Sequence, residues 1–236
     1  MEVFLNKRKV RINSSVGRWT SLAGLAVLIV GMVVSFRNPQ LVWVSLTSLV
    51  VGFLASVIGA YYANHWTRSP RADEILSQAL KGISNKYHLY HYLLPAKHVL
   101  LGPAGLFVFR TYLNEGRIAY DGKKWKQKFS WARALGFSGQ DALGDPVQDA
   151  LYDAQRLQRW LERRLPHHKI PTIDPFVVFV RDNIELAVEE TAIPVISHKQ
   201  LKRLVRQIDK ECTDPLDENA LYDIEQAALG DRVSDL

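Results

Sequence analysis

The chain has 236 residues, long enough for one folded domain and an additional segment. Its single cysteine, Cys212, excludes an internal disulfide and fits a reducing compartment. The formal charge of +6 is unevenly spread along the chain. Residues 68–133 carry twelve Lys and Arg against four Asp and Glu, whereas residues 134–236 carry twelve Lys and Arg against nineteen Asp and Glu. The counts predict a basic half and an acidic half.

Two apolar stretches without charged residues, 19–36 and 41–64, follow a basic N-terminal segment at 1–18. As a helix that rises about 1.5 Å per residue, each is long enough to cross roughly 30 Å of hydrocarbon. Residues 37–40 between them form a short polar turn. We therefore predict a transmembrane helical hairpin over 19–66, with the lipid bilayer as its partner. A cleaved signal peptide and a buried core hairpin are the alternatives.

The basic residues around this hairpin predict its orientation. Five Lys and Arg precede it and Arg68 and Arg71 follow it, whereas the turn carries only Arg37. The positive-inside rule then places both termini and the soluble domain in the cytoplasm, as in an integral cell-membrane protein. The basic run 7–11 either sets this topology alone or also contacts anionic lipid.

The remaining sequence predicts an α/β sandwich around a mixed sheet, over residues 67–211, and an acidic helical tail at 212–236. A helix is expected to open at Ser69-Pro70, because Ser caps helices, Pro fits the first position and acids at 73 and 74 suit the first turn. Apolar runs and turn signals then predict strands at 87–94, 97–101, 106–111, 117–120 and 124–129, a helix at 145–165, strands at 176–181 and 193–196, and helices at 198–211 and 217–229.

The stretch 94–118 is the most specific part of the sequence. Its two apolar runs flank Gly102-Pro103-Ala104-Gly105, where Pro fixes φ and Gly permits a positive φ, so the pattern predicts a β-hairpin. The stretch resembles the core of the nuclease-related domain (NERD) of the PD-(D/E)xK nuclease superfamily, whose members typically read Asp-His-hydrophobic-Gly-Pro-x-Gly-hydrophobic-Glu-Thr-Lys. The residues that match are His98, Gly102, Pro103, Gly105, Thr111 and Gly116.

The resemblance extends over roughly residues 70–205 and implies a restriction-endonuclease-like fold. It also implies a metal site, because the Asp and Glu of the family hold a divalent cation beside the Lys. In this chain Lys97 stands in place of the Asp, Arg110 in place of the Glu and Tyr112 in place of the Lys. The other positions equivalent to family site residues are Glu74 on the first helix and Gln148 on the long helix.

Mg²⁺ needs at least two converging carboxylates to polarise phosphate and water. With Glu74 alone at this site, we expect no catalytic residue, no resident metal and no other cofactor. Lys97 and Arg110 are expected to pair with Glu74, or else to hold phosphate without cleaving it. The alternative is an active Mg²⁺-dependent nuclease whose ligands have moved to Glu115 or Asp121.

A basic stretch with interleaved aromatics offers a second candidate surface. Candidate phosphate-binding residues are Lys97, Arg110, Lys123, Lys124, Lys126 and Lys128, and Trp125 is a candidate for stacking on bases. A solvated strand face, or contact with lipid headgroups, explains the same stretch. The expected function is therefore that of a membrane-anchored, inactive nuclease relative that binds nucleic acid or another protein, and a lipid-facing scaffold is the further alternative. His88 and His91 are expected to face opposite sides of a strand and to form no metal site.

Overall fold

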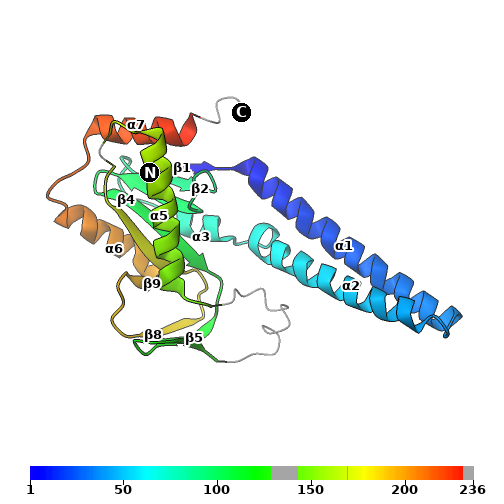
Figure 1. Cartoon of the computed structure of the whole chain (residues 1–236). Coiled ribbons are helices and arrows are strands. Elements are labelled where there is room, and N and C mark those ends of the chain that lie inside the picture. Colours follow the sequence, from blue (N-terminus) through cyan, green and yellow to red (C-terminus); the bar gives the residue numbers. More distant parts are fainter. Residues whose placement is uncertain (129–142, 169, 231–236) are drawn as a thin grey trace. The chain divides into compact units, whose positions relative to one another are not determined.

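The computed structural model describes residues 1–128, 143–168 and 170–230, and the chain forms two compact units. One unit contains Met1–Asn6, Ala72–Lys128 and the described residues from 143 onward, and the other contains Lys7–Arg71. Figure 1 shows the strands and shorter helices of the first unit and the two long helices of the second. Phe129, the last residue of a predicted strand, and residues 231–236 of the predicted tail lie outside the described residues.

A six-stranded mixed sheet is the centre of the first unit, which confirms the predicted α/β architecture. Neighbouring strands β2, β3 and β4 are antiparallel, and the pairs β1–β2, β4–β7 and β7–β9 are parallel. In spatial order the strands are β1 (Glu2–Leu5), β2 (His88–His91), β3 (His98–Gly102), β4 (Gly105–Tyr112), β7 (Ile173–Phe179) and β9 (Val195–Ser197). A smaller sheet contains β6 (Trp125–Gln127), β5 (Gly116–Tyr120) and β8 (Ile184–Val188), in that order.

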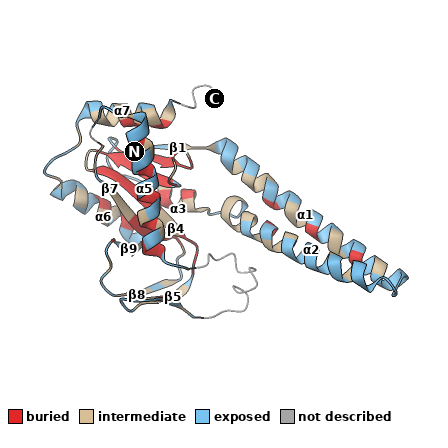
Figure 2. Ribbon diagram, in the orientation of Figure 1, coloured by how far each residue is buried: buried red, intermediate tan, exposed pale blue. Residues whose placement is uncertain are grey.

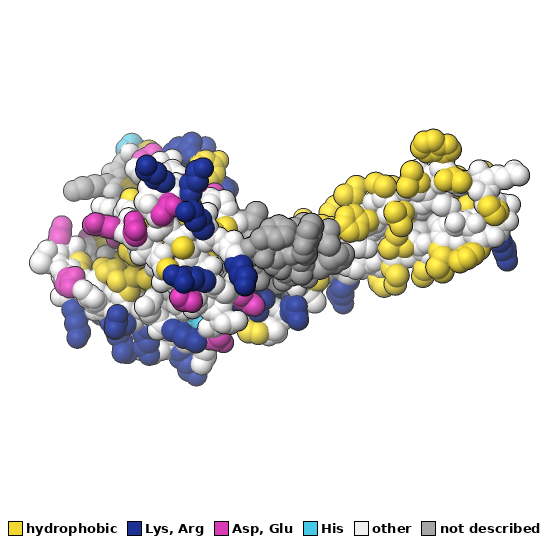
Figure 3. Space-filling view, turned by 90° about the horizontal axis from the view of Figure 1, so that it is seen from below, with side chains coloured by type: hydrophobic (Ala, Val, Ile, Leu, Met, Phe, Trp, Pro, Cys, Tyr) yellow, Lys and Arg dark blue, Asp and Glu magenta, His cyan; other side chains and the backbone are white. Residues whose placement is uncertain are grey.

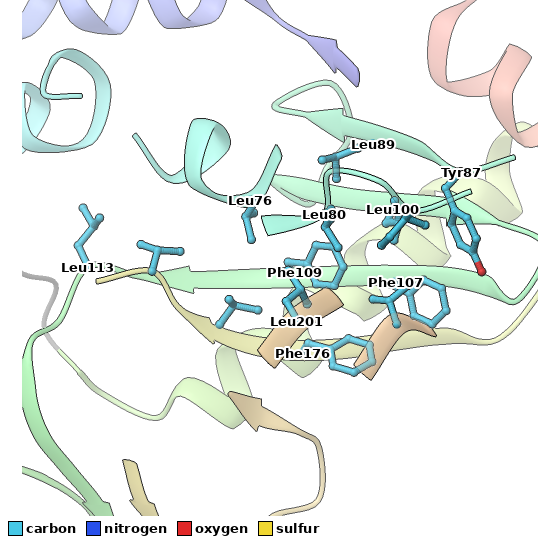
Figure 4. Packing of buried hydrophobic residues seen from close by; sticks show 14 residues of the cluster. Leu76, Leu80, Tyr87, Leu89, Leu100, Phe107, Phe109, Leu113, Phe176 and Leu201 are labelled. Carbon is cyan, nitrogen blue, oxygen red and sulfur yellow. The ribbon is translucent and has the colours of Figure 1, made fainter. Parts of the chain in front are cut away.

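Helices cover both faces of the large sheet. The side chains of α3 (Ala72–Ala79) and α6 (His198–Glu211) join one buried cluster, and those of α5 (Pro146–Arg164) and α7 (Glu218–Leu229) join another. Alternation along the strands separates the two clusters, so that Phe107 lies in the first and Val108 in the second. Figure 4 shows the first cluster around Phe107, Phe109 and Phe176, and Figure 2 shows that buried residues concentrate in the sheet.

The predicted β3–β4 hairpin is confirmed, and its two glycines are required for different reasons. A Cβ atom on Gly102 would lie 2.1 Å from Cδ1 of Tyr87, so this glycine lets the buried tyrosine ring pack against the turn. Gly105 has a φ of +126°, a conformation that side-chain-bearing residues rarely adopt. The Gly-Pro-x-Gly pattern therefore reports both a close packing contact and a backbone constraint.

The first residues of the chain belong to the sheet, although the sequence assigned them to a basic segment ahead of the hairpin. Val3 pairs in parallel with Leu89 in the register of β1 and β2, and the Asn6 amide donates to the carbonyl oxygen of His91 at 3.1 Å. The Phe4 ring stacks on Tyr90 with ring centres 5.2 Å apart. Four residues are too few for a periodic pattern, which is why this strand was not predicted. Strand β8, with its alternating Ile184, Leu186 and Val188, was also missed.

The second unit is a pair of long helices, α1 (Lys7–Arg37) and α2 (Val42–Tyr62), followed by a π-helical turn at Ala63–Thr67. Helix α1 is longer than the predicted span 19–36 because the polar residues at 7–18 continue it, whereas α2 lies within the predicted span 41–64. Their only buried residues are glycines at seven-residue spacing, namely Gly17, Gly24 and Gly31 on α1 and Gly52 and Gly59 on α2. Hydrophobic side chains cover the outside of the pair, as Figure 3 shows, and both helices are long and apolar enough to cross a membrane.

Candidate functional site

Arg110 on β4 is the centre of the candidate site. Along β4 the side chains of Val108, Arg110 and Tyr112 lie on the same face, because successive residues of a strand point to opposite sides. Val108 and Tyr112 both belong to clusters that contain residues of α5. Arg110 therefore extends toward α5, and not toward α3 on the opposite face.

Helix α5 presents two carboxylates to this arginine. Its start is fixed by Asp145, whose side chain accepts hydrogen bonds from the amides of Val147 and Gln148, each at 3.2 Å, with Pro146 in the first turn. From this start, Asp149 and Asp153 lie one helical turn apart and project from the same side of the helix. The cap thus fixes the rotation of α5 about its own axis, so that the side chains of Asp149 and Asp153 face β4.

The arginine bridges these two acids. Nη2 of Arg110 donates to Oδ2 of Asp149 at 3.1 Å, and Nη1 donates to Oδ2 of Asp153 at 3.2 Å. The hydroxyl of Tyr112 donates to the same Oδ2 of Asp149 at 2.6 Å. Two carboxylates, which in another setting could hold a divalent cation, here converge on a guanidinium group with a tyrosine hydroxyl beside it.

Burial gives this cluster its electrostatic character. The side chain of Asp153 is 8% exposed and that of Arg110 is 27% exposed, whereas Asp149 is 47% exposed. Burial opposes the charge of Arg110, but Tyr112 and the carboxylates of Asp153 and Asp149 outweigh it, so the pKa of the guanidinium is raised. Burial, followed by its hydrogen bond to Asp149, raises the pKa of the Tyr112 hydroxyl. The arginine is therefore charged and the tyrosine neutral at physiological pH.

The expected pairing of Arg110 with Glu74 is wrong. Helix α3, which carries Glu74, packs on the opposite face of the sheet together with α6, whereas the ion pairs of Arg110 lead to α5. The physical reason is that successive side chains of a strand point to opposite faces of the sheet, so residues of one sequence motif can lie on different faces. Lys97 immediately precedes β3, and its carbonyl oxygen accepts a hydrogen bond from the Tyr92 amide at 2.6 Å. A pairing of Lys97 with Glu74 stays a prediction.

A chain of buried and half-buried polar groups lies on the α3 face. Nδ1 of His98 and Nδ1 of His91 are 2.8 Å apart, and Nε2 of His91 is 2.9 Å from Oγ of Ser77. The Ser77 hydroxyl donates to the carbonyl oxygen of Asp73 at 2.7 Å, so it accepts from Nε2–H of His91. When His91 is neutral, its Nδ1 then accepts from Nδ1–H of His98, which leaves Nε2 of His98 as a bare lone pair.

His98 is held in its neutral form. Its side chain is fully buried, and burial, followed by the neighbouring His91 and the charges of Lys97 and Arg110, holds its pKa well below the ordinary value. Its Nε2 atom has no hydrogen-bond partner among the described residues. Lys97 and Arg110 are therefore close enough to the histidine to act on it electrostatically, although the ion pairs of Arg110 lie on the α5 face.

Comparison with known families gives one result. Residues 70–180 match the family model of the nuclease-related domain. This part of the chain is a NERD domain. No curated protein and no solved structure matched the chain. The match runs from the residues before α3 to the end of β7, so the helix pair, the edge strands β1 and β9, and helices α6 and α7 lie outside it.

Within the NERD domain, the remaining predicted residues are distributed over different places. The backbone N–H of Gln148 donates to the capping side chain of Asp145, and Glu115 forms an ion pair with Arg181 at 3.6 Å. His88 and His91 face opposite sides of β2, as expected, because His88 lies 3.0 Å from Glu225 of α7 and His91 contacts Ser77 of α3. No group of three or more His, Cys, Asp or Glu within the described part of the NERD domain could hold a metal ion.

The basic stretch surrounds the turn between β5 and β6. Asp121 accepts hydrogen bonds from the amides of Lys123 and Lys124, and its Oδ2 atom lies 2.6 Å from Nζ of Lys126. The ring of Trp125 stacks on Tyr120 with centres 4.6 Å apart and packs against a buried cluster. Trp125 is thus partly engaged within the NERD domain, while Lys123 and Lys124 are exposed.

Asp149 and Asp153 are the residues of the candidate site that sequence reasoning missed. A signal for Asp153 was present, since it falls within the apolar stripe that Ala150, Ala154 and Leu157 form on α5. An acid at a core position of an amphipathic helix requires a buried partner. Arg110 gives a corresponding signal, because a charged residue in a largely apolar strand also requires a partner.

Proposed function

We propose that this chain is a membrane-anchored NERD-domain protein that binds its partner without cleaving nucleic acid. The observation that carries the proposal is the bridge from Arg110 to Asp149 and Asp153, with Tyr112 beside it. Arg110 and Tyr112 stand where the family carries a metal-binding Glu and its neighbouring Lys. A guanidinium therefore occupies the space between carboxylates that a cation would need.

The chemistry of the cluster supports the absence of catalysis. A divalent cation accelerates phosphodiester hydrolysis because it polarises the phosphate and lowers the pKa of a bound water molecule. A guanidinium carries one positive charge, binds no water as a ligand and does not deprotonate in proteins, so it supplies neither effect. We infer that the arginine neutralises the acids of α5 and stabilises the fold, and that it takes no part in catalysis.

The alternative of an active nuclease with relocated ligands receives less support. Its candidate ligands already have cationic partners, since Glu115 is paired with Arg181 and Asp121 with Lys126. A divalent cation would have to displace a lysine or arginine at each. We therefore favour binding over catalysis. Nucleic acid is the first candidate partner, because both the family resemblance and the exposed lysines at 123 and 124 favour it. Another protein is the second candidate.

Membrane anchoring is supported by the surface of the helix pair. Only 11% of the residues in the most apolar window of each helix are buried, so these are not core helices of a soluble fold. Trp19 and Trp43 are 70% and 79% exposed, and such a surface is stable only in an apolar environment. A signal sequence is removed, whereas strand β1, which precedes α1, is part of the sheet.

The connectivity supports an even number of membrane crossings. The segment before α1 and the segment after α2 belong to the same folded unit, so both ends of the hairpin must lie on the same side of the bilayer. The basic residues that flank the hairpin favour the cytoplasmic side. Cysteine labelling of the sheet unit from outside intact cells would contradict this orientation.

A cleavage assay tests the proposed function. The full chain, in detergent or nanodiscs, is incubated with plasmid, single-stranded DNA and RNA in the presence of Mg²⁺ or Mn²⁺, because removal of the helix pair would also remove strand β1. We expect no cleavage, and weak binding that decreases steeply with salt because it depends on the release of counterions. Cleavage that disappears with chelator and in Glu74→Ala would overturn the proposal in favour of the relocated site.

A further inference from the structure

Helix α6 carries a row of cations on its outer face. Leu201 and Val205 on its inner face are buried in the cluster beneath the sheet. The opposite face has a shallow hollow of about 480 Å³, whose lining consists of Lys199, Lys202, Arg203, Arg206, Gln207 and Lys210. The row lies outside the NERD match and within the part of the sequence that is acidic overall.

Most of these cations have no carboxylate partner in the part of the chain that the structure describes. Lys199 is the exception, since its Nζ atom lies 2.9 Å from Oδ1 of Asp182. Lys202 and Arg206 donate to the backbone carbonyl oxygens of Lys81 and Gly82, which fixes the two side chains without neutralising their charge. The row is therefore both held in place and positively charged.

The acids of α6 do not compensate the row either. Asp209 accepts a hydrogen bond from the hydroxyl of Tyr87, and Glu211 accepts one from Gln207. Arg203 and Lys210 are exposed and have no ion-pair partner among the described residues. Four cations from Lys202 to Lys210 thus face solvent with no direct counter-ion within the described structure.

We propose that the basic face of α6 binds the headgroups of anionic lipids in the bilayer that holds the helix pair, an inference that rests on the membrane anchoring proposed above. The cations from Lys199 to Lys210 form a row about 16 Å long along the helix, at about 1.5 Å per residue. Basic residues near a membrane surface are attracted by its anionic lipids. Helix α6 has no Phe, Tyr or Trp on which a base could stack, which disfavours single-stranded nucleic acid as the partner.

The connections of the sheet unit favour the lipid further. One residue, Asn6, separates β1 from α1, and four residues, 68–71, separate the π-helical turn from α3. Short connectors keep a tethered domain at a high effective concentration near the surface to which it is tethered. Weak individual contacts are then sufficient for binding.

A fluorescence experiment on the full chain tests this inference. A polarity-sensitive fluorophore is attached at Gln207→Cys in a Cys212→Ala background, and the chain is inserted into nanodiscs of phosphatidylcholine alone or with phosphatidylserine. We expect phosphatidylserine to protect the probe from an aqueous quencher, and salt to reverse the protection. The double variant Arg203→Glu and Lys210→Glu, which breaks no described ion pair, should weaken the protected state at least about 30-fold.

A matched double variant controls for net charge. Arg159→Glu and Arg163→Glu make the same charge change on exposed positions of α5 and are expected to leave the protection unchanged. Equal protection in neutral nanodiscs, or equal loss in the two double variants, would overturn the inference. So would protection by an added RNA or DNA oligonucleotide without protection by anionic lipid, which would assign the face to nucleic acid.

The same samples separate this inference from the anchoring on which it rests. A chain that fails to enter nanodiscs contradicts the membrane anchor and removes the basis of the inference as well. A chain that enters nanodiscs but leaves its probe equally accessible in both lipid compositions contradicts only the lipid-binding face.

Discussion

At the residue scale, the role of Arg110 depends on the acidic side chains that surround it. Its two nitrogens contact two acids that lie one helical turn apart, and one of those acids is nearly buried. The loss of one member of a buried ion pair leaves an uncompensated charge, which is the largest energetic effect such a cluster has. The two aspartates should therefore differ sharply in importance.

Asp153→Ala should destabilise the sheet unit by about 2–4 kcal/mol, because it leaves Arg110 with its charge only partly compensated in a poorly hydrated site. Asp149→Ala should cost no more than about 1 kcal/mol, because its carboxylate is half exposed. Chemical denaturation of the full chain, followed by tryptophan fluorescence, measures both. Equal effects of the two substitutions would contradict the assigned burial, and Arg163→Ala serves as an exposed control.

The buried histidine pair gives a prediction about pH. Because the folded-state pKa of His98 is lowered, the unfolded chain binds more protons than the folded chain below the unfolded pKa of about 6.5. Stability should therefore decrease as the pH falls from about 6.5 toward the lower folded-state pKa, by up to about 1.4 kcal/mol per pH unit for one proton.

Denaturation at several pH values in this range tests the assignment. His98→Gln should flatten the dependence, and it also removes the ring that His91 contacts. His167→Gln, at an exposed position, is the control and should leave the dependence unchanged. A His98→Gln variant with the slope of the unsubstituted chain would show that the histidine is not the titrating group.

The positions of individual site residues were only partly predictable from the sequence. The motif identified Arg110 and Tyr112 as positions equivalent to metal-site residues, but it contained no information about the face to which each side chain points. That information resides in the strand alternation and in the cap at Asp145, which together direct Arg110 toward α5. The acids of α5 lie 39 and 43 residues from Arg110, too far for a local pattern to connect them.

At the scale of secondary-structure elements, the helix pair depends on close backbone contact. A Cβ atom on Gly24 would lie 3.0 Å from the Cβ of Ala55 and 3.1 Å from the carbonyl oxygen of Gly52. Small residues allow such approach where lipid tails give no hydrophobic advantage to association. The seven-residue spacing keeps these contacts on one side of each helix.

Gly24→Leu should therefore separate α1 from α2. A pair of cysteines at Ser14 and Thr67, whose hydroxyl oxygens are 3.0 Å apart, reports the packing through the rate of disulfide formation in a Cys212→Ala background. We expect Gly24→Leu to slow the reaction, whereas Leu25→Ile on the exposed side should not. An unchanged rate in Gly24→Leu would contradict the glycine-based interface.

Most elements with strong local signals were predicted well, although the first helix of the sheet unit begins at Ala72 and not at Ser69-Pro70. The β3–β4 hairpin, α5 and α6 each have a turn or cap with its own chemistry, such as the capping box that Ser197 and Gln200 form at α6. Strand β1 has four residues and acquires its structure only by pairing with β2, which lies more than eighty residues further along the chain. Such a strand depends on tertiary context.

At the scale of the whole molecule, residues on both sides of the helix pair build one folded unit. Strand β1 completes an edge of the sheet, and Phe4 packs against a core cluster that also contains residues of α5 and α7. The helix pair is thus inserted into the sheet unit in sequence and joined to it at both ends. Residues before the hairpin should therefore affect the stability of the domain that follows it.

Phe4→Ala should lower the free energy of unfolding of the sheet unit by about 1–3 kcal/mol, because it removes the ring that stacks on Tyr90 and leaves a cavity. Val3→Ala, at a position 45% exposed, is the matched control and should have a much smaller effect. Thermal unfolding of the full chain in nanodiscs measures both. If the two variants unfold at the temperature of the unsubstituted chain, β1 does not support the sheet.

The central claim, that an arginine occupies the place of a metal ion, is tested most directly by titration of the full chain with Mn²⁺, monitored by electron paramagnetic resonance. We predict no stoichiometric binding by the unsubstituted chain and a gain of binding in Arg110→Ala, which frees the carboxylates of Asp149 and Asp153. One tightly bound Mn²⁺ per unsubstituted chain, lost on substitution of Glu74, Glu115 or Asp121, would contradict the claim.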